Sequence, residues 1–193
     1  MTYNNDFVAS KLRRWEKYLN NFRLPAWEDI PDFGLYMEQM ISLLEKYLDY
    51  LPPELKAEQF VTAATINNYV RKKIMPEPVK KKYYRTHIAY LIIILTLKQS
   101  LSIALIQKIL PATLNESEIE KFYRDYVLQH SRIAQYFVSH VKLIAAPVLK
   151  HEITSDIATD KIENIITSSA IMGGFSQLLA EKLLLLPPEN NEE

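Results

Sequence analysis

The stretch VTAATINNYVRKKIMP, from Val61 to Pro76, decides the fold that we expect for this chain. Thr62 can cap the start of a helix, because a threonine hydroxyl accepts a hydrogen bond from the free backbone N–H groups of the first turn. Pro76 ends the helical pattern, since proline lacks the N–H that a helix interior needs. The sequence therefore predicts a helix from Thr62 to about Ile74.

This predicted helix has one apolar face and one polar face when its residues are placed at about 100° per residue. The apolar face carries Ala63, Ile66, Val70 and Ile74, with Tyr69 and Lys73 at its edge. The polar face carries Ala64, Thr65, Asn67, Asn68, Arg71 and Lys72. Asparagine pairs with adenine and arginine with guanine through two hydrogen bonds each, so the polar face offers side chains that read the major groove of DNA.

A basic segment follows the helix. Between Phe60 and Lys98 the chain has eight basic residues and one acid, whereas the formal net charge of the whole protein is zero. Such a local excess of positive charge indicates a surface for a polyanion. The run from Lys80 to Lys82 would contact the DNA backbone and add affinity without sequence information. The candidate DNA-binding residues are Thr62, Thr65, Asn67, Asn68, Tyr69, Arg71, Lys72, Lys80, Lys81, Lys82 and Tyr83.

Each of these signals also has a plainer interpretation. The lysine run could be an ordinary solvated loop, and Asn67 and Asn68 could be surface amides. Tyr69 and Tyr83 fit packing residues with hydroxyls at the surface better than residues that read bases. The position of the lysines, directly after a helix that carries asparagine and arginine, favours the functional interpretation.

The composition favours an all-α protein. The 193-residue chain has three glycines and is rich in leucine, isoleucine, glutamate and lysine, so tight β-hairpins are scarce and helices favoured. It has no cysteine, which excludes disulfides, thiolate metal sites and cysteine nucleophiles. The four histidines lack the spacing of a metal site, and we expect each at the surface or at a helix end. They are His87, His130, His140 and His151.

No catalytic motif stands out in the sequence. There is no phosphate-cradling glycine loop, no G-x-S-x-G elbow and no H-E-x-x-H pair. The carboxylates Glu118 and Glu120 lie in a capping box that begins at Asn115, which is the simpler explanation for them. We therefore expect a protein that is not an enzyme and that needs no cofactor or metal ion.

Helix-like apolar spacing continues on both sides of the basic segment. The predicted flanking helices cover residues 7–22, 35–51, 88–99, 102–110, 117–145 and 155–186. The 88–99 helix is apolar nearly all round and should be buried as a central helix. Gly173-Gly174 in the last helix indicates a kink or a close helix contact. We divide the chain into a helical lead-in (1–30), a DNA-binding region (31–111) and a C-terminal helical region (112–193).

The sequence also predicts where the protein works. Its first residues lack the basic region and apolar core of a signal peptide. Its longest apolar run, Tyr90 to Leu97, is far shorter than the roughly 20 residues of a membrane span. We expect a cytoplasmic protein without membrane contact.

The basic segment and its surroundings resemble the DNA-binding pattern of the MerR family. The resemblance rests on Val61 to Tyr69, Ile74-Met75-Pro76, Tyr83, Leu91 and Leu101-Ser102-Ile103 with Ile106 and Leu110, in order and approximate spacing. It implies a winged helix-turn-helix, with a recognition helix before Pro76 and a wing after it. Thr65, Asn67, Asn68, Tyr69 and Arg71 would then face DNA, and Lys81 would match the basic residue of the wing.

The chain resembles, more narrowly, a MerR-like family of Gram-positive bacteria known only as a domain of unknown function. This likeness rests on Leu24-Pro25-Ala26-Trp27, Leu35-Tyr36-Met37, Ile66 to Val70 and His87 to Leu91. It implies transcription regulation and supplies no effector. The chain departs from the MerR pattern at Pro52-Pro53 and Phe60, which replace a short helix and a glycine turn, and at Tyr84, which replaces a serine cap.

The sequence thus predicts an all-α, MerR-like winged helix-turn-helix protein that regulates transcription as a homodimer. Pairing would double the short half-site read by one recognition helix, so the operator should be palindromic. The 117–145 helix could pair the two copies or belong to a C-terminal bundle, and this region could hold a small-molecule effector. The alternatives are a helical interaction module that does not bind DNA and, as a third candidate, a helical enzyme.

Overall fold

The computed structural model describes residues 4–49, 61–110 and 112–186. These residues form eight α-helices and one short 3-10 helix and contain no strand. The helices are α1 (Asn5–Asn21), η1 (Trp27–Asp29), α2 (Met37–Tyr47), α3 (Ala63–Arg71), α4 (Arg85–Leu97), α5 (Ile103–Ile109), α6 (Glu116–Ile144), α7 (Ala146–Leu149) and α8 (Ile162–Leu184). The predicted all-α class is confirmed for this part of the chain.

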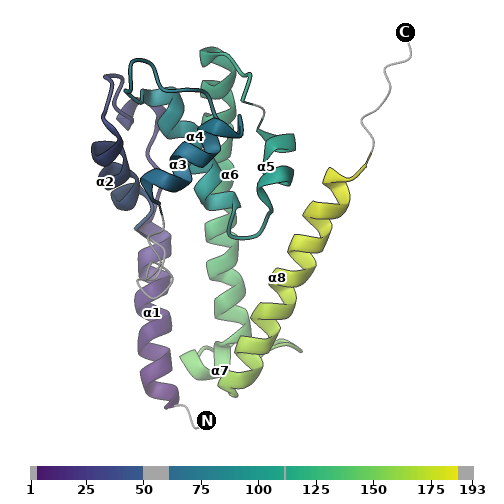
Figure 1. Ribbon diagram of the computed structural model, residues 1–193. Coiled ribbons are helices and arrows are strands. Elements are labelled where there is room, and N and C mark those ends of the chain that lie inside the picture. The colour runs from purple at the N-terminus through teal and green to yellow at the C-terminus, as the bar shows by residue number, and fades with distance from the viewer. Residues whose placement is uncertain (1–3, 50–60, 111, 187–193) are drawn as a thin grey trace.

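The helices form a head and a stalk (Figure 1). The head contains residues 24–49, 61–110 and 112–126, and the stalk contains residues 5–22 and 127–186. α1 and α6 lie side by side along the stalk, α7 closes its base, and α8 rises from this base towards α5 while diverging from α6. The stalk has its own small core of Ala9, Ile144, Ala145, Val148, Leu149 and Ile162. None of the helices in the described residues is long and apolar enough to cross a membrane.

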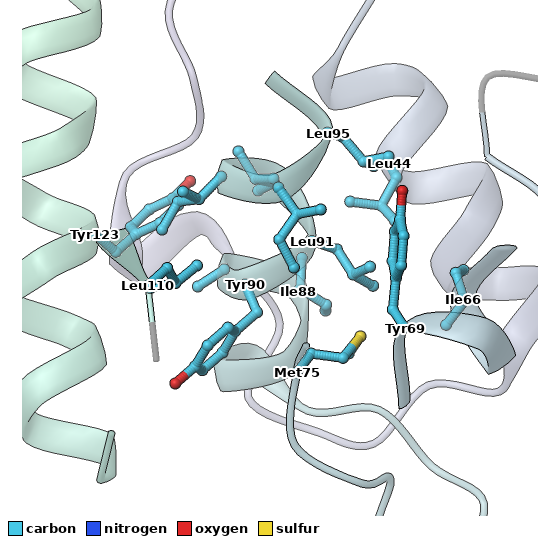
Figure 2. Close-up of a cluster of buried hydrophobic side chains, with 14 of the residues drawn as sticks. Leu44, Ile66, Tyr69, Met75, Ile88, Tyr90, Leu91, Leu95, Leu110 and Tyr123 are labelled. Carbon is cyan, nitrogen blue, oxygen red and sulfur yellow. The ribbon is translucent and has the colours of Figure 1, made fainter. Parts of the chain in front are cut away.

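α4 lies at the centre of the head because it is apolar on all sides. Nine consecutive residues, His87 to Leu95, are buried. In Figure 2, Leu91 of α4 lies between Tyr123 of α6 on one side and Tyr69 of α3 on the other. The predicted buried central helix is confirmed: α2, α5 and α6 pack against it, and Tyr69 of α3 lies beside it.

Side-chain caps fix where three of the helices begin. Thr62, Ser102 and Asn115 precede α3, α5 and α6. Each side-chain oxygen accepts a hydrogen bond from the backbone N–H three residues later, at 3.0, 3.4 and 3.0 Å. The carboxylate of Glu118 accepts in return from the N–H of Asn115 at 2.8 Å, which confirms the predicted capping box.

Some boundaries differ from the predictions. α3 ends at Arg71 rather than near Ile74, and α8 begins at Ile162 rather than near Ser155. α2 ends at Tyr47, and the remainder of the predicted 35–51 helix falls partly on residues outside those described, as do Pro52, Pro53 and Phe60. The division of the chain at residues 30 and 111 stays a prediction.

The described residues contain no strand, so the predicted wing is not found as a strand pair. Two isolated antiparallel bridges, Leu35–Tyr83 and Val79–Lys82, occur instead. Leu35 and Tyr83 exchange both backbone hydrogen bonds, each 2.8 Å long. Gly34 lies beside this bridge, and a Cβ there would meet Lys82 Cβ at 2.8 Å and Tyr84 Cζ at 2.9 Å. The close approach of the two segments therefore requires a glycine at this position.

Replacing Gly34 by alanine should destabilise the head by about 1 to 3 kcal/mol, because the added methyl group must displace the 82–84 segment. Urea denaturation followed by circular dichroism measures the change as a lower midpoint. Gly173→Ala is the matched control, since a Cβ at Gly173 meets no atom within 4 Å and alanine favours a helix. A Gly34→Ala variant as stable as the wild type would contradict the tight approach.

Candidate nucleic-acid interface

The start of α3 is held by two threonines. The backbone N–H of Thr65 donates to Thr62 Oγ1 at 3.0 Å, and the two hydroxyl oxygens lie 2.9 Å apart. Both side chains are half-buried. Thr62 and Thr65 therefore orient the helix, and the polar surface that α3 presents lies further along it.

α3 has one buried and one exposed face, as predicted, except that Ala63 of the predicted apolar face is exposed and Tyr69, predicted at its edge, is buried. Ile66 is fully buried in the core of the head, whereas Asn67, Arg71 and Lys72 are exposed. Arg71 Nη2 donates to Asn68 Oδ1 at 2.9 Å. This hydrogen bond orients the guanidinium and the amide on the exposed face, where both kinds of group can meet base edges.

The two candidate tyrosines lie in the core. Tyr69 is 5% exposed and Tyr83 is 3% exposed, and burial raises the pKa of both phenols. The ring of Tyr83 contacts the buried ring of His87 edge-on, with centroids 5.7 Å apart. Both rings pack beneath the surface, in agreement with the packing interpretation, and we leave them out of the proposed DNA contacts.

Residues 79–82 form a tight turn between α3 and α4. Val79 and Lys82 form an antiparallel bridge and exchange both backbone hydrogen bonds, each 3.0 Å long. Lys80 and Lys81, at the tip, have φ values of 49° and 63°. Such left-handed values at both central positions belong to the type I′ turn, which favours Asn-Gly and Gly-Gly pairs. The turn thus presents two lysines in a conformation that suits glycine better.

A third lysine is left-handed at the end of α3. Lys73 has a φ of 54°, and the N–H of Ile74 donates to the carbonyl of Tyr69 at 2.9 Å. This arrangement closes the helix at a position where glycine is usual, and it turns Ile74 into the core. It explains why α3 is shorter than predicted. Three of the four described non-glycine residues with positive φ therefore lie between the end of α3 and the tip of the turn.

Not all of the lysines and arginines of the basic segment face solvent. Arg85 Nε donates to the carbonyl of Ile30 at 2.8 Å, and its guanidinium lies 5.7 Å from the ring centre of Trp27. Lys98 is half-buried, and this burial lowers its pKa. Lys82 is half-buried beside Gly34, with its ammonium 5.4 Å from the ring centre of Tyr36.

The remaining five cations form what we call the basic surface. It consists of Arg71, Lys72, Lys73, Lys80 and Lys81, which are all exposed. No carboxylate within residues 4–49, 61–110 and 112–186 forms a salt bridge with any of them. Their charges are therefore available to an anionic partner.

His87 is a residue whose role the sequence analysis missed. It lies at the start of α4, which agrees with the predicted helix end, and it is 4% exposed, so it is buried and not at the surface. Its Nδ1 accepts from the N–H of Tyr84 at 3.0 Å, so Nε2 carries the proton and donates to the carbonyl of Glu77 at 2.9 Å. The imidazole caps α4 in place of the absent serine and ties down the segment that carries the turn. Its spacing, three residues after Tyr84, was the available signal.

Replacing His87 by alanine should lower the free energy of unfolding by roughly 2 to 3 kcal/mol, because it leaves the N–H of Tyr84 and the carbonyl of Glu77 without their partner. Urea denaturation measures the loss. The matched control is His151→Ala, since His151 is exposed and should be replaceable at no cost. Equal midpoints for the two variants would contradict the structural role of His87.

A second candidate site is an apolar groove of about 640 Å³ beside the stalk. Its lining includes Trp15 of α1 and Phe137 of α6, whose rings meet edge-on with centroids 5.4 Å apart. The titratable groups of the lining are Tyr126 and His130, and burial raises the pKa of the first and lowers the pKa of the second. Both stay uncharged near neutral pH, so the groove suits apolar groups.

The fold and the basic surface define the class of protein: an all-helical chain whose head exposes a polar helix face and a lysine-tipped turn. The chain belongs to the family described as a domain of unknown function (DUF1836), which matches residues 25–126. These residues include every candidate DNA-binding residue. No curated protein and no solved structure matches the chain. The tie to MerR regulators stays a prediction.

Proposed function

We propose that this protein is a DNA-binding transcription regulator that places α3 in the major groove and the turn at Lys80 and Lys81 on the phosphate backbone. The observation that carries the proposal is the basic surface. Its five exposed cations have no salt-bridge partner among the described residues. An unneutralised patch of this kind on a chain of zero net charge favours a polyanion as partner.

The backbone of the basic surface supports this proposal. Holding a non-glycine residue in the left-handed region costs roughly 1 to 2 kcal/mol, and Lys73, Lys80 and Lys81 all adopt it. Glycine would fit each position at lower cost in the folded state. Lysine at these strained positions is explained if its ammonium group binds an anionic partner, since strained backbone tends to occur at functional sites.

In this proposal the two parts of the surface have different tasks. Asn67, Asn68 and Arg71 of α3 read base edges, because amides and guanidinium groups match adenine and guanine. Lys80 and Lys81 neutralise phosphates and set the position of the head on the duplex. The turn from Val79 to Lys82 acts as a reduced wing, which is how the MerR-like winged helix-turn-helix enters the proposal. A homodimer would read a palindromic operator.

The second candidate is an interaction module without DNA binding. The observation in its favour is the number of large apolar side chains that the stalk exposes, among them Ile133 and Phe137 on α6 and Phe175 on α8. Such surfaces mark protein contacts. This candidate predicts that the basic surface has no salt-sensitive affinity for DNA.

Arg71→Ala should weaken binding to the operator by about 1 to 3 kcal/mol and relax its specificity, whereas Lys81→Ala should weaken binding to every sequence and lower the salt slope by about one. Fluorescence anisotropy over a salt series, with promoter fragments from the genome that encodes the protein, measures both effects. Lys161→Ala is the control, because Lys161 is an exposed lysine at the N-cap of α8, outside the basic surface.

Two outcomes would count against the proposal. Absence of binding at low salt would favour the interaction module. Equal losses for Arg71→Ala and Lys81→Ala on every sequence would show that Arg71 contacts phosphate and does not read a base.

Lys81→Gly should separate stability from binding. Glycine relieves the left-handed strain at a φ of 63°, so the variant should be more stable by roughly 0.5 to 1 kcal/mol and yet bind DNA more weakly, because a phosphate contact is lost. Thermal unfolding and the anisotropy assay give the two values. A Lys81→Gly variant that loses stability, or one that binds DNA as tightly as the wild type, would contradict the functional explanation of the strain.

A further inference from the structure

α8 exposes a stripe of large apolar side chains. Six of them, which we call the α8 stripe, are between 47% and 66% exposed. They are Ile171, Met172, Phe175, Leu178, Leu179 and Leu183. Residues 165–180 of this helix contain no lysine, arginine, aspartate or glutamate. Soluble monomers rarely present so continuous an apolar surface to water.

The α8 stripe faces away from the rest of its own chain. At about 100° per residue, the six side chains fall on one side of α8 and Ile162, Ala180 and Leu184 fall on the other. Ile162 belongs to the core of the stalk, and Ala180 and Leu184 pack against the core of the head. Lys108 Nζ also donates to the carbonyl of Leu184 at 3.2 Å, which holds this end of α8 to α5. The chain therefore uses one side of α8 and leaves the stripe uncovered.

We infer that the α8 stripe is the surface through which two copies of this chain pair, with the two α8 helices crossing antiparallel at Phe175. The inference names the surface of the homodimer that the proposed function invokes, and its test does not depend on DNA binding. A second copy is the occupant that the stripe fits, because the same apolar surface on each copy is self-complementary about a two-fold axis.

The size of the α8 stripe agrees with a dimer contact. Half-exposed side chains of this size offer on the order of 100 Å² each, so six of them offer roughly 600 Å² per copy and roughly 1,200 Å² in the pair. That area reaches the lower limit of stable protein interfaces before any contact from α6 is added. Met172, Phe175 and Leu179 of the stripe are also three and four residues apart, the spacing by which helices pair.

Charge decides the direction of the crossing. With Phe175 opposite its own copy, Met172 lies opposite Leu178, and Lys182 lies opposite Ser168. A parallel, in-register pair would instead place Lys182 opposite Lys182 of the second copy, where like charges repel. The antiparallel crossing also places Ile171 opposite Leu179, and it separates the two lysines.

The absence of cysteine from the chain gives a direct test by cross-linking. In the full-length protein, Phe175→Cys should form a disulfide between two copies under mild oxidation, because the two sulfur atoms meet at the crossing point. Gln177→Cys is the matched control, since Gln177 is exposed on the other side of the same helix. Leu183→Cys should also remain unlinked, and efficient linking through Leu183→Cys would overturn the antiparallel crossing.

Analytical ultracentrifugation without DNA provides the second readout. The wild type should sediment as a dimer at micromolar concentration, and the double change Phe175→Glu with Leu179→Glu should shift it to a monomer with unchanged helix content. Gln177→Glu adds a charge to the same helix and should remain a dimer. A monomeric wild type, or a dimer that survives the double change, would overturn the inference. Since no DNA is present, this failure is distinct from a failure to bind an operator.

Discussion

The burial of α4 on every side is the constraint on which the rest of the head depends. Nine consecutive residues of α4 are buried, so its apolar side chains point in every direction around the helix. Other helices must therefore cover α4 on all sides. α2, α5 and α6 supply this cover, and α3 adds Tyr69. Because Ile66 and Tyr69 are buried in the core around α4, the opposite face of α3 points outward. The orientation of the candidate DNA-reading face is thus a consequence of packing.

The same helix also positions the second half of the surface. His87 is buried in the first turn of α4 and bonds the backbone on both sides of the lysine-tipped turn, at Glu77 and Tyr84. The bridge between Leu35 and Tyr83 adds a second anchor from the segment before α2. The turn can therefore hold two lysines in strained conformations, because the anchors at its base are independent of the residues at its tip.

The sequence was sufficient where periodicity and capping chemistry determine structure. The apolar face of α3, the buried centre and the caps at Thr62 and Asn115 were all predicted and are confirmed. The left-handed lysines were not predictable, because lysine carries no intrinsic preference for positive φ and only the surrounding contacts impose it. The role of His87 was missed because an imidazole at the third helical position resembles no standard cap. The packing of the core determines neither base recognition by α3 nor the pairing of two copies through α8.

α6 connects the head, which carries the basic surface, to the base of the stalk, from which α8 rises. α6 begins in the head, where Ile119 and Tyr123 pack in its core, and ends in the stalk, where Val138 and Ile144 are buried. Its 29 residues span roughly 43 Å at about 1.5 Å per residue. α8 follows α6 through α7 and the non-helical residues 150–161, and its far end contacts α5 of the head. A pair formed at α8 would therefore constrain the distance between two α3 helices through the contact of α8 with the head. The spacing of the operator half-sites would then depend on the stalk, whereas their sequence would depend on α3.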